Sequence, residues 1–362
     1  MKNTLGNSIT VTLFGESHAK AIGAVIDGLA PGIEVDEEFI AAQLDLRRPV
    51  GAISTPRVEA DKFEILSGVF EGKTTGTPVC IVIPNENTKS KDYSEIRCKA
   101  RPGHADFTAF QKYHGFEDYR GGGHFSGRIT AALVAAGAIA VLALRKKGIN
   151  IGTHIARCAG VNDINFSNLD EDISALNKKE FAVLSDAFGE DMKNAILKAK
   201  QDGDSVGGIL ETAVTGMPAG VGEPWFDSVE SVLSRAMFAI PAIKGVEFGA
   251  GFSISDMKGS YANDPFKIEN GEIVTLSNNN GGINGGITNG MPIIFRCAVK
   301  PTPTISKNQQ TVDFINMQNT EILAGGRHDP CIVHRARVVV DSVTALVLCD
   351  ILATRFGTDW LA

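Results

Sequence analysis

The stretch AALVAAGAIAVLAL, residues 131–144, decides the fold of this chain. A helix at a protein surface keeps one polar face, and this stretch has none. The pattern therefore predicts a helix buried on all sides, which starts at Ser126 or Thr130 and ends in Arg145-Lys146-Lys147 before Gly148. The apolar run is 14 residues long. Because a bilayer needs about 20 residues, the run is not expected to cross a membrane.

Around this helix the chain mixes strand patterns with helix patterns. No regular βαβα rhythm, internal repeat or linker appears, so the sequence favours an α+β fold over a doubly wound α/β fold. The C-terminal segment 335–356 predicts a strand or turn that leads into a helix. Other strands are predicted at 8–14, 22–29, 62–70, 78–84, 206–215 and within 291–299, and other helices at 36–46, 185–201 and 227–239.

Composition limits the class of protein. The 362-residue chain has 43% hydrophobic and 21% charged residues, a balance typical of soluble globular proteins. Its net charge of −7 argues against a general nucleic-acid binder, although a local basic cleft can still hold an anion. The six cysteines are scattered without a CxxC pair, and the N-terminus has no signal-peptide pattern. We therefore expect a cytoplasmic protein with reduced thiols and no membrane association.

Directly before the apolar helix, residues 101–128 read RPGHADFTAFQKYHGFEDYRGGGHFSGR. Three histidines and three arginines lie among glycines, without the periodicity of a core helix or strand. This composition predicts a loop that binds an anion and transfers protons. Within it, His104 lies between Arg101 and Asp106, and such neighbours set the tautomer and charge of an imidazole.

Other polar segments add candidates. His18 ends a predicted strand in FGESHAKAIG, although a structural histidine is the alternative interpretation. YRGGGHFSGR (119–128) combines glycines, which permit close backbone approach, with a helix N-terminus that can bind an anion; a plain glycine hinge is the alternative. The remaining candidates are the arginines of LRRP (46–49) and the loops KPTPTISK (300–307) and GGRHDP (325–330). Together they indicate an anionic, phosphorylated substrate but name no reaction.

Several familiar motifs fail. GVFEGKT (68–74) has three residues between its glycines where a phosphate-binding P-loop needs four, and no GxGxxG dinucleotide motif occurs. GESHA around Ser17 lacks the second glycine of a hydrolase nucleophile elbow. His328, Cys331 and His334 would need a fourth ligand to bind zinc, and no metal is expected.

At the level of motifs the chain resembles chorismate synthase. The resemblance implies one domain over residues 1–362, a sandwich of antiparallel sheets around long buried helices, and a homotetramer. The matching segments follow one another along essentially the whole chain: GESH (15–18), RRP (47–49), SGVFEGKTTGTP (67–78), RPGHAD (101–106), DYRGGGHFSGR (118–128), GDSVGG (203–208), KGVEFGAGF (244–252), GGINGGITNG (281–290), KPTPTI (300–305) and GRHDPC (326–331).

The resemblance also implies a reaction. A chorismate synthase converts 5-enolpyruvylshikimate 3-phosphate to chorismate by 1,4-elimination of phosphate and a ring hydrogen, and it requires reduced FMN. By this resemblance, His18 would protonate the departing phosphate, His104 would keep the reduced flavin in its working protonation state, and Asp329 would assist proton removal near the flavin.

Binding residues are implied in the same way. By the resemblance, Arg47 is the candidate contact for NADPH, a possible source of electrons. The flavin is nevertheless expected to be reduced by an external flavin reductase. The substrate's anionic groups would be held by Ser17, Arg47, Arg48, Arg101, Arg128 and Arg327. FMN would contact His124, Phe125, Ser126, Ala242, Gly285, Lys300, Pro301, Thr302, Pro303, Thr304 and Arg327.

Some positions depart from the family's usual pattern. Ala19 replaces a glycine, Pro241 an asparagine and Asp341 a glutamate; HFSGR replaces GRSSAR at 124–128; and 50–56 lacks an arginine often assigned to nicotinamide nucleotides. These changes weaken the detailed FMN contacts and any NADPH site more than the family resemblance. A flavin- or phosphometabolite-binding protein without turnover is one alternative function, and a serine hydrolase that uses Ser17 is another.

Overall fold

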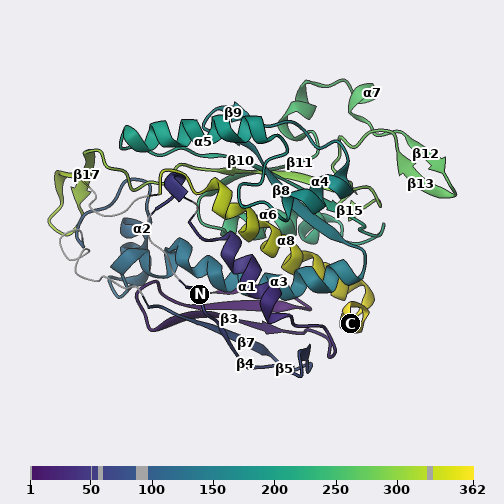
Figure 1. Ribbon diagram of the computed structural model, residues 1–362, viewed down its shortest axis with the longest axis horizontal. Helices are drawn as coiled ribbons and strands as arrows, with labels where there is room; N and C mark the ends of the chain where they lie inside the picture. The colour runs from purple at the N-terminus through teal and green to yellow at the C-terminus, as the bar shows by residue number, and fades with distance from the viewer. Residues whose placement is uncertain (1, 50, 56–59, 87–96, 324–328) are drawn as a thin grey trace.

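The protein consists of two antiparallel sheets with a layer of long helices between them (Figure 1). The structure is a computed structural model, and it describes residues 2–49, 51–55, 60–86, 97–323 and 329–362. The two large sheets have five strands each, and every neighbouring pair of strands in them is antiparallel. The predicted α+β sandwich is confirmed.

The first sheet, in the order β1-β2-β3-β7-β4, is built from the N-terminal part of the chain. The predicted strand at 62–70 is divided at Gly68, whose φ of +83° turns the backbone. Beyond it, β5 (Val69–Phe70) pairs with β6 (Lys73–Thr74) instead. The strands of the sheet are β1 (Thr4–Leu5), β2 (Thr10–Gly15), β3 (Ala21–Asp27), β7 (Val79–Pro84) and β4 (Glu64–Ser67).

The second sheet has the order β11-β16-β10-β8-β9. Sequence analysis did not identify β8, because Gly152, Thr153 and His154 interrupt its apolar residues, although all three are buried. The strands are β11 (Ile243–Phe248), β16 (Ile293–Val299), β10 (Gly208–Thr215), β8 (Asn150–Cys158) and β9 (Val161–Asn162).

The central layer is formed by α3 (Thr130–Lys146), α8 (Val333–Phe356) and α1 (Glu37–Leu46). Helix α3 packs on α8, α1 and strands β3 and β7, whereas α8 contacts β8 and β10. Every residue from 130 to 141 is buried, as the all-round apolar pattern predicts. The length argument against a membrane span was wrong, because the helical segment Gly127–Lys146 has 20 residues and is apolar enough to cross a bilayer. What identifies it as a core helix is that 83% of its apolar window is buried inside the protein.

The predicted strand or turn before the C-terminal helix was wrong. Residues 333–356 form one continuous helix, despite the β-branched run VVV (338–340). Burial between α3 and the second sheet outweighs the strand propensity of these residues. Arg337 and Asp341, four positions apart and thus neighbours on one face of the helix, form a buried ion pair of 3.0 Å.

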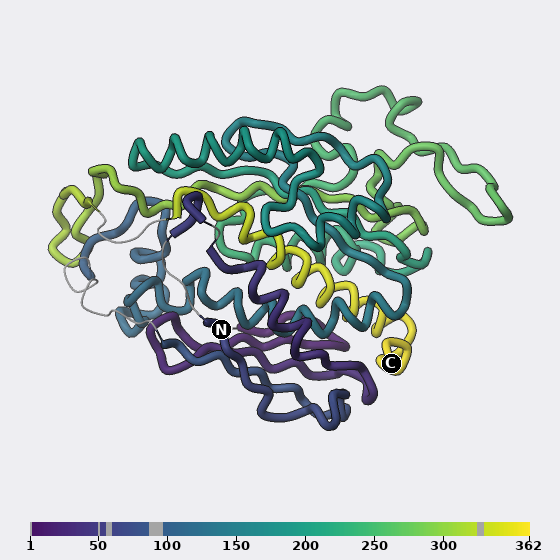
Figure 2. Tube along the Cα trace, in the orientation of Figure 1, coloured from purple at the N-terminus to yellow at the C-terminus, as the bar shows by residue number. Residues whose placement is uncertain are grey.

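The remaining elements surround this sandwich. Helix α5 lies beside β9, the edge strand of the second sheet. An arm that carries β12 and β13 projects away from the body (Figures 1 and 2). These elements are α2 (Asp106–Tyr113), α4 (Leu169–Leu176), α5 (Asp186–Gln201), α6 (Val229–Ala239), α7 (Gly259–Ala262), β12 (Phe266–Glu269), β13 (Glu272–Thr275), β14 (Ile283–Asn284), β15 (Ile287–Thr288), β17 (Gln309–Asp313) and β18 (Gln318–Ile322).

The contact between α3 and α8 depends on Gly137. A Cβ atom at this position would lie 2.3 Å from Ser342 Cβ and 2.6 Å from its Cα, so the two helix backbones meet here. We expect Gly137→Ala to destabilise the protein by about 1–3 kcal/mol, the usual cost of overpacking a core, and to lower its Tm in calorimetry. Gly259→Ala is the control, because Gly259 is also helical but has nothing within 4 Å of the position that a Cβ would take. An unchanged Tm for Gly137→Ala would contradict the close approach.

Candidate active site

His18 lies in a tight turn at the end of β2. The turn is closed by a hydrogen bond from Ala19 N to Glu16 O (3.1 Å), which leaves Ser17 and His18 as its two central residues. Both side chains are buried. Ser17 Oγ lies 3.1 Å from His18 Nδ1 and donates to Arg120 O, also at 3.1 Å. The GESH motif therefore places His18 at the end of a strand, in a turn closed by a hydrogen bond and in contact with Ser17 Oγ.

The glycine run at 121–123 brings the two candidate histidines into one place. Gly121 and Gly122 have φ values of +60° and +88°, which only glycine adopts without strain. A Cβ at Gly121 would lie 2.2 Å from His18 Cε1, and one at Gly122 would lie 3.2 Å from His104 Nε2. The predicted close backbone approach exists, and its targets are these two imidazoles.

His104 is held by its neighbours in sequence. Its Nδ1 lies 2.8 Å from Asp106 Oδ1, and Arg101 binds both oxygens of the same carboxylate at 2.7 and 2.8 Å. Burial alone would raise the pKa of Asp106, but the hydrogen bonds from Arg101 and His104 hold that pKa well below its usual range. Since an ionised carboxylate only accepts, this contact requires a proton on Nδ1. His104 Nε2 is then the nitrogen that can exchange a proton.

The prediction of a loop over 101–128 was wrong in part. Residues 106–113 form helix α2, which begins at the anchored Asp106 and fully buries only Ala109. So small an apolar face gives no recognisable periodicity. Residues 120–125 and 127–129 form 3₁₀ turns before α3 begins.

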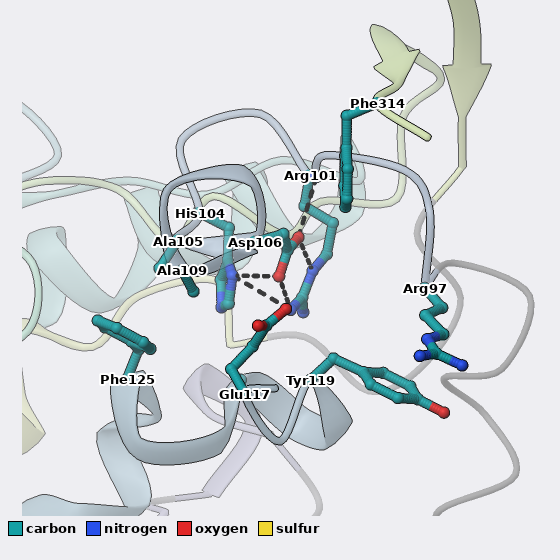
Figure 3. Close-up of a pocket in the computed structure, with 11 residues that line it drawn as sticks. Arg97, Arg101, His104, Ala105, Asp106, Ala109, Glu117, Tyr119, Phe125 and Phe314 are labelled. Atoms are coloured by element: carbon teal, nitrogen blue, oxygen red, sulfur yellow. Dashed lines mark hydrogen bonds and ion pairs between the residues drawn. The ribbon is translucent and has the colours of Figure 1, made fainter. Parts of the chain in front are cut away.

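A small cavity, partly open to solvent, lies beside His104. Figure 3 shows His104, Arg101 and Glu117 on its wall together with the rings of Phe125, Tyr119 and Phe314. Glu117 Oε2 is buried and has no hydrogen-bond partner among the described residues. Aromatic walls with a few polar groups are typical of a site for a flat organic molecule.

A second group of charges is centred on Asp61. This side chain is 1% exposed, and its carboxylate binds Arg47 Nη2 at 2.9 Å and Arg128 Nη1 on the other oxygen. Burial and the charges of Arg335 and Arg128 lower the pKa of Arg47 to about 10, against the opposing effect of Asp61. Burial would raise the pKa of Asp61, but the two arginines hold it below its usual value. Two guanidinium groups around one carboxylate leave a net positive charge that favours an anion.

The other substrate candidates are distributed around this group. Arg48 is more exposed, pairs with Asp45 at 2.8 Å and donates to Ala60 O at 2.5 Å. Asp329 accepts from Thr55 N at 2.8 Å and pairs with Arg335 at 2.7 Å. Arg335 Nε in turn donates to Arg47 O at 2.8 Å, so Asp329 adjoins the Asp61 group. Arg327 and His328 lie outside the described residues.

Most of the FMN candidates adjoin the two histidines. His124 Nδ1 lies 2.7 Å from Gly15 O, Phe125 lines the cavity, and Ser126 Oγ accepts from Arg128 N. The loop 300–304 lies against Gly103, since Lys300 Nζ donates to Gly103 O at 2.5 Å. Thr302 Oγ1 in that loop is buried with no partner among the described residues, so it is available to a ligand.

Two FMN candidates differ in their setting. Ala242 has a φ of +76° and accepts from Lys300 N at 3.0 Å, so it joins the same loop. Gly285 turns the β14–β15 hairpin, where its neighbour Gly286 accepts from Val229 N at the start of α6. In Figure 1, β15 lies on the right of the body and α2 on the left, so the hairpin is far from the helix that follows His104.

The zinc alternative finds no support among the residues that the structure describes. Cys331 Sγ lies 3.6 Å from Cys158 Sγ, and that contact together with burial raises the pKa of Cys331 well above its ordinary value. His334 Nε2 is 2.8 Å from Ser54 Oγ. Within the described ranges no group of three His, Cys, Asp or Glu side chains could hold a metal ion.

Sequence analysis missed three residues that organise the site: Asp61, Arg335 and Asn85. Asn85 follows β7 and accepts from Arg128 Nε at 3.0 Å. Asn85 lies at the end of a strand, as His18 does. The same signal that selected His18 could therefore have selected Asn85. Nothing in the segment around Asp61 distinguishes it from an ordinary surface aspartate.

The comparison with known proteins decides the family. The family model described as chorismate synthase matches residues 9–353. The chain belongs to the chorismate synthase family. A chorismate synthase of Dehalococcoides mccartyi is 47% identical over 99% of this chain and 98% of its own, and one of Pyrococcus abyssi is 47% identical over 97% of each. A crystal structure of chorismate synthase superposes with a TM-score of 0.77 at 30% identity and covers 97% of this chain and 94% of that one.

Membership fixes the class of reaction. Chorismate synthase is a carbon–oxygen lyase of aromatic amino acid biosynthesis that acts on a small molecule, and its family uses a flavin cofactor. A serine hydrolase that uses Ser17 is therefore not supported. The positions that depart from the family's usual pattern do not include His18 or His104. Asp341, for example, lies in the core with Arg337 and Thr153, away from the cavity.

Proposed function

We propose that this member of the chorismate synthase family converts 5-enolpyruvylshikimate 3-phosphate to chorismate by 1,4-elimination of phosphate and a ring hydrogen. The observation that carries the proposal is the placement of His18 and His104 against the consecutive glycines Gly121 and Gly122. The buried arginines around Asp61 supply the positive charge that so anionic a substrate needs.

His18 donates a proton to the departing phosphate in this proposal. A phosphate that leaves must lose its bond to carbon while its charge grows, so a proton donor and nearby cations lower the barrier. Arg47 and Arg128 are buried, where their charges are weakly screened. Ser17, Arg48, Arg101 and Arg327 complete the proposed substrate set.

Reduced FMN, when bound, would supply transient electron donation and would help to remove the hydrogen in a reaction that is redox-neutral overall. The residues proposed to hold it are those of the cavity wall and the 300–304 loop, and the buried, unpartnered Thr302 Oγ1 fits a polar ligand there. His104, with its proton fixed on Nδ1, presents Nε2 toward the glycine run and sets the protonation state of its surroundings. Asp329 is the proposed proton acceptor near the flavin.

We infer that the flavin is reduced by a separate reductase, with NADPH as a possible electron source. Arg47, the candidate contact for NADPH, belongs to the Asp61 group that the proposal assigns to the substrate. We also propose a cytoplasmic location, where free thiols such as the six cysteines of this chain persist.

An anaerobic assay tests the function. The protein is mixed with 5-enolpyruvylshikimate 3-phosphate and chemically reduced FMN, and chorismate absorbance and phosphate release are followed together. We expect both products with reduced FMN and neither with oxidised FMN. Tight binding of flavin and substrate without turnover would overturn the proposal in favour of a binding protein.

We also propose that the enzyme is a homotetramer, supported by the projecting arm (Figure 2). Cross-strand partners Ile268 and Ile273 are 78% and 69% exposed, and Phe266 on the same face is 63% exposed. An apolar face of this kind is typical of a surface that a second copy of the chain covers. We expect the double change Ile268→Asp with Ile273→Asp to yield smaller oligomers in light scattering, whereas Lys267→Gln in the same hairpin keeps the wild-type mass. An unchanged mass for the double variant would exclude the arm from the interface.

A further inference from the structure

The side chain of Asn85 connects the His18 turn to the buried arginines. Its Nδ2 donates to Glu16 O at 3.0 Å and to Ala19 O at 2.9 Å. These are the carbonyls of the first and last residues of the turn that carries Ser17 and His18. One amide group therefore closes the turn from outside.

The acceptor of the same amide faces the other part of the site. Asn85 Oδ1 accepts from Arg128 Nε at 3.0 Å, and Arg128 continues to Asp61 and through it to Arg47. Both amide hydrogens and the oxygen of Asn85 are thus used, two on the proton-transfer side and one on the anion-binding side. Its backbone is fixed as well, because Asn85 N donates to Lys20 O at 3.0 Å.

We propose that Asn85 is a positioning residue, which sets the distance and orientation of the His18 imidazole relative to the arginines that bind the substrate's anionic group. Asparagine suits this role because it donates twice and accepts once in one plane. An aspartate has the same shape but lacks both donors. Its carboxylate oxygen would face the carbonyl oxygens of Glu16 and Ala19, and these oxygens repel one another. The inference rests on the proposed function, in which His18 delivers a proton to an anion held by arginine.

Two substitutions separate the two halves of the connection. Asn85→Asp keeps an acceptor for Arg128 but releases the His18 turn, so we expect kcat to fall about 10²-fold, the usual effect of misplacing a catalytic group by about 1 Å. The new carboxylate also offsets the charge of Arg128, so substrate affinity, measured by calorimetry with oxidised FMN, should weaken about tenfold. Asn85→Ala also releases the turn but adds no charge, and Arg128 stays bound to Asp61 and to Pro84 O. We therefore expect kcat to fall similarly while substrate affinity changes less than threefold, on the order of 0.6 kcal/mol.

The control is Asn177→Asp, because Asn177 also donates from its amide to a backbone carbonyl, that of Ile151, at 3.0 Å between α4 and β8. We expect it to lower Tm without changing kcat. If the folded Asn85 variants both keep kcat within twofold of the wild type, Asn85 is not a positioning residue. If kcat and affinity fall equally in Asn85→Ala, the selective connection to His18 is wrong. Inactive wild-type protein would instead contradict the proposed function, so the two failures are distinguishable.

Discussion

His104→Ala is expected to bind FMN and substrate almost as the wild type does and to lose turnover by about 10²–10⁴-fold, the usual range for general acid–base help. The reason is the fixed ring of His104. Asp106 holds its Nδ1, so Nε2 is free to exchange a proton at the cavity beside Gly122. Alanine removes this group and leaves the arginines around Asp61 unchanged.

The measurement for His104→Ala is the anaerobic assay, with flavin and substrate binding determined separately. His114→Asn is the matched control, because His114 lies at the end of the neighbouring helix α2, outside the cavity wall, and has a φ of +58° that asparagine tolerates. We expect it to retain full activity. A rate for His104→Ala within threefold of the wild type would remove His104 from the mechanism.

How far the sequence predicts the fold depends on what decides each element. The apolar run 131–144 predicts its helix because no exposed segment has such a composition. The β-branched run at 338–340 misleads, since its helix is decided by packing against α3 and the second sheet. Strand β8 was missed because polar Thr153 and His154 are buried by partners that come from other elements, Asp341 and Asp163. Local patterns cannot contain that information.

The same distinction applies to the site. His18 and His104 could be selected because each lies beside residues that would hold it, in GESH and RPGHAD. Their meeting at Gly121 and Gly122 depends on where two distant loops fold, although the glycine run itself signals a close approach. Asp61 could not be predicted, because it is important only through Arg47 and Arg128. The end of α1 and the 3₁₀ turn before α3 bring these arginines to it.

Gly121→Ala is expected to reduce turnover at least as strongly as a direct change to His18, by about 10²-fold or more, because it displaces a catalytic group. An added Cβ would lie 2.2 Å from His18 Cε1, 2.4 Å from its Nδ1 and 2.8 Å from Ser17 Oγ. Both of these side chains are buried, so neither can move aside into solvent. The left-handed backbone of Gly121 adds strain of roughly 1–2 kcal/mol for an alanine.

Strain and steric displacement can be separated with Gly160→Ala. Gly160 has a φ of +87° but nothing within 4 Å of the position that its Cβ would take, so alanine there brings the strain without the clash. We expect Gly160→Ala to lower Tm and keep kcat, whereas Gly121→Ala loses kcat at temperatures well below its own Tm. If both variants lost stability alike and both kept kcat, the contact between Gly121 and His18 would have no catalytic importance. A selective loss in Gly121→Ala would instead mean that the glycine run is required because it lets the backbone lie directly against the imidazole that donates the proton.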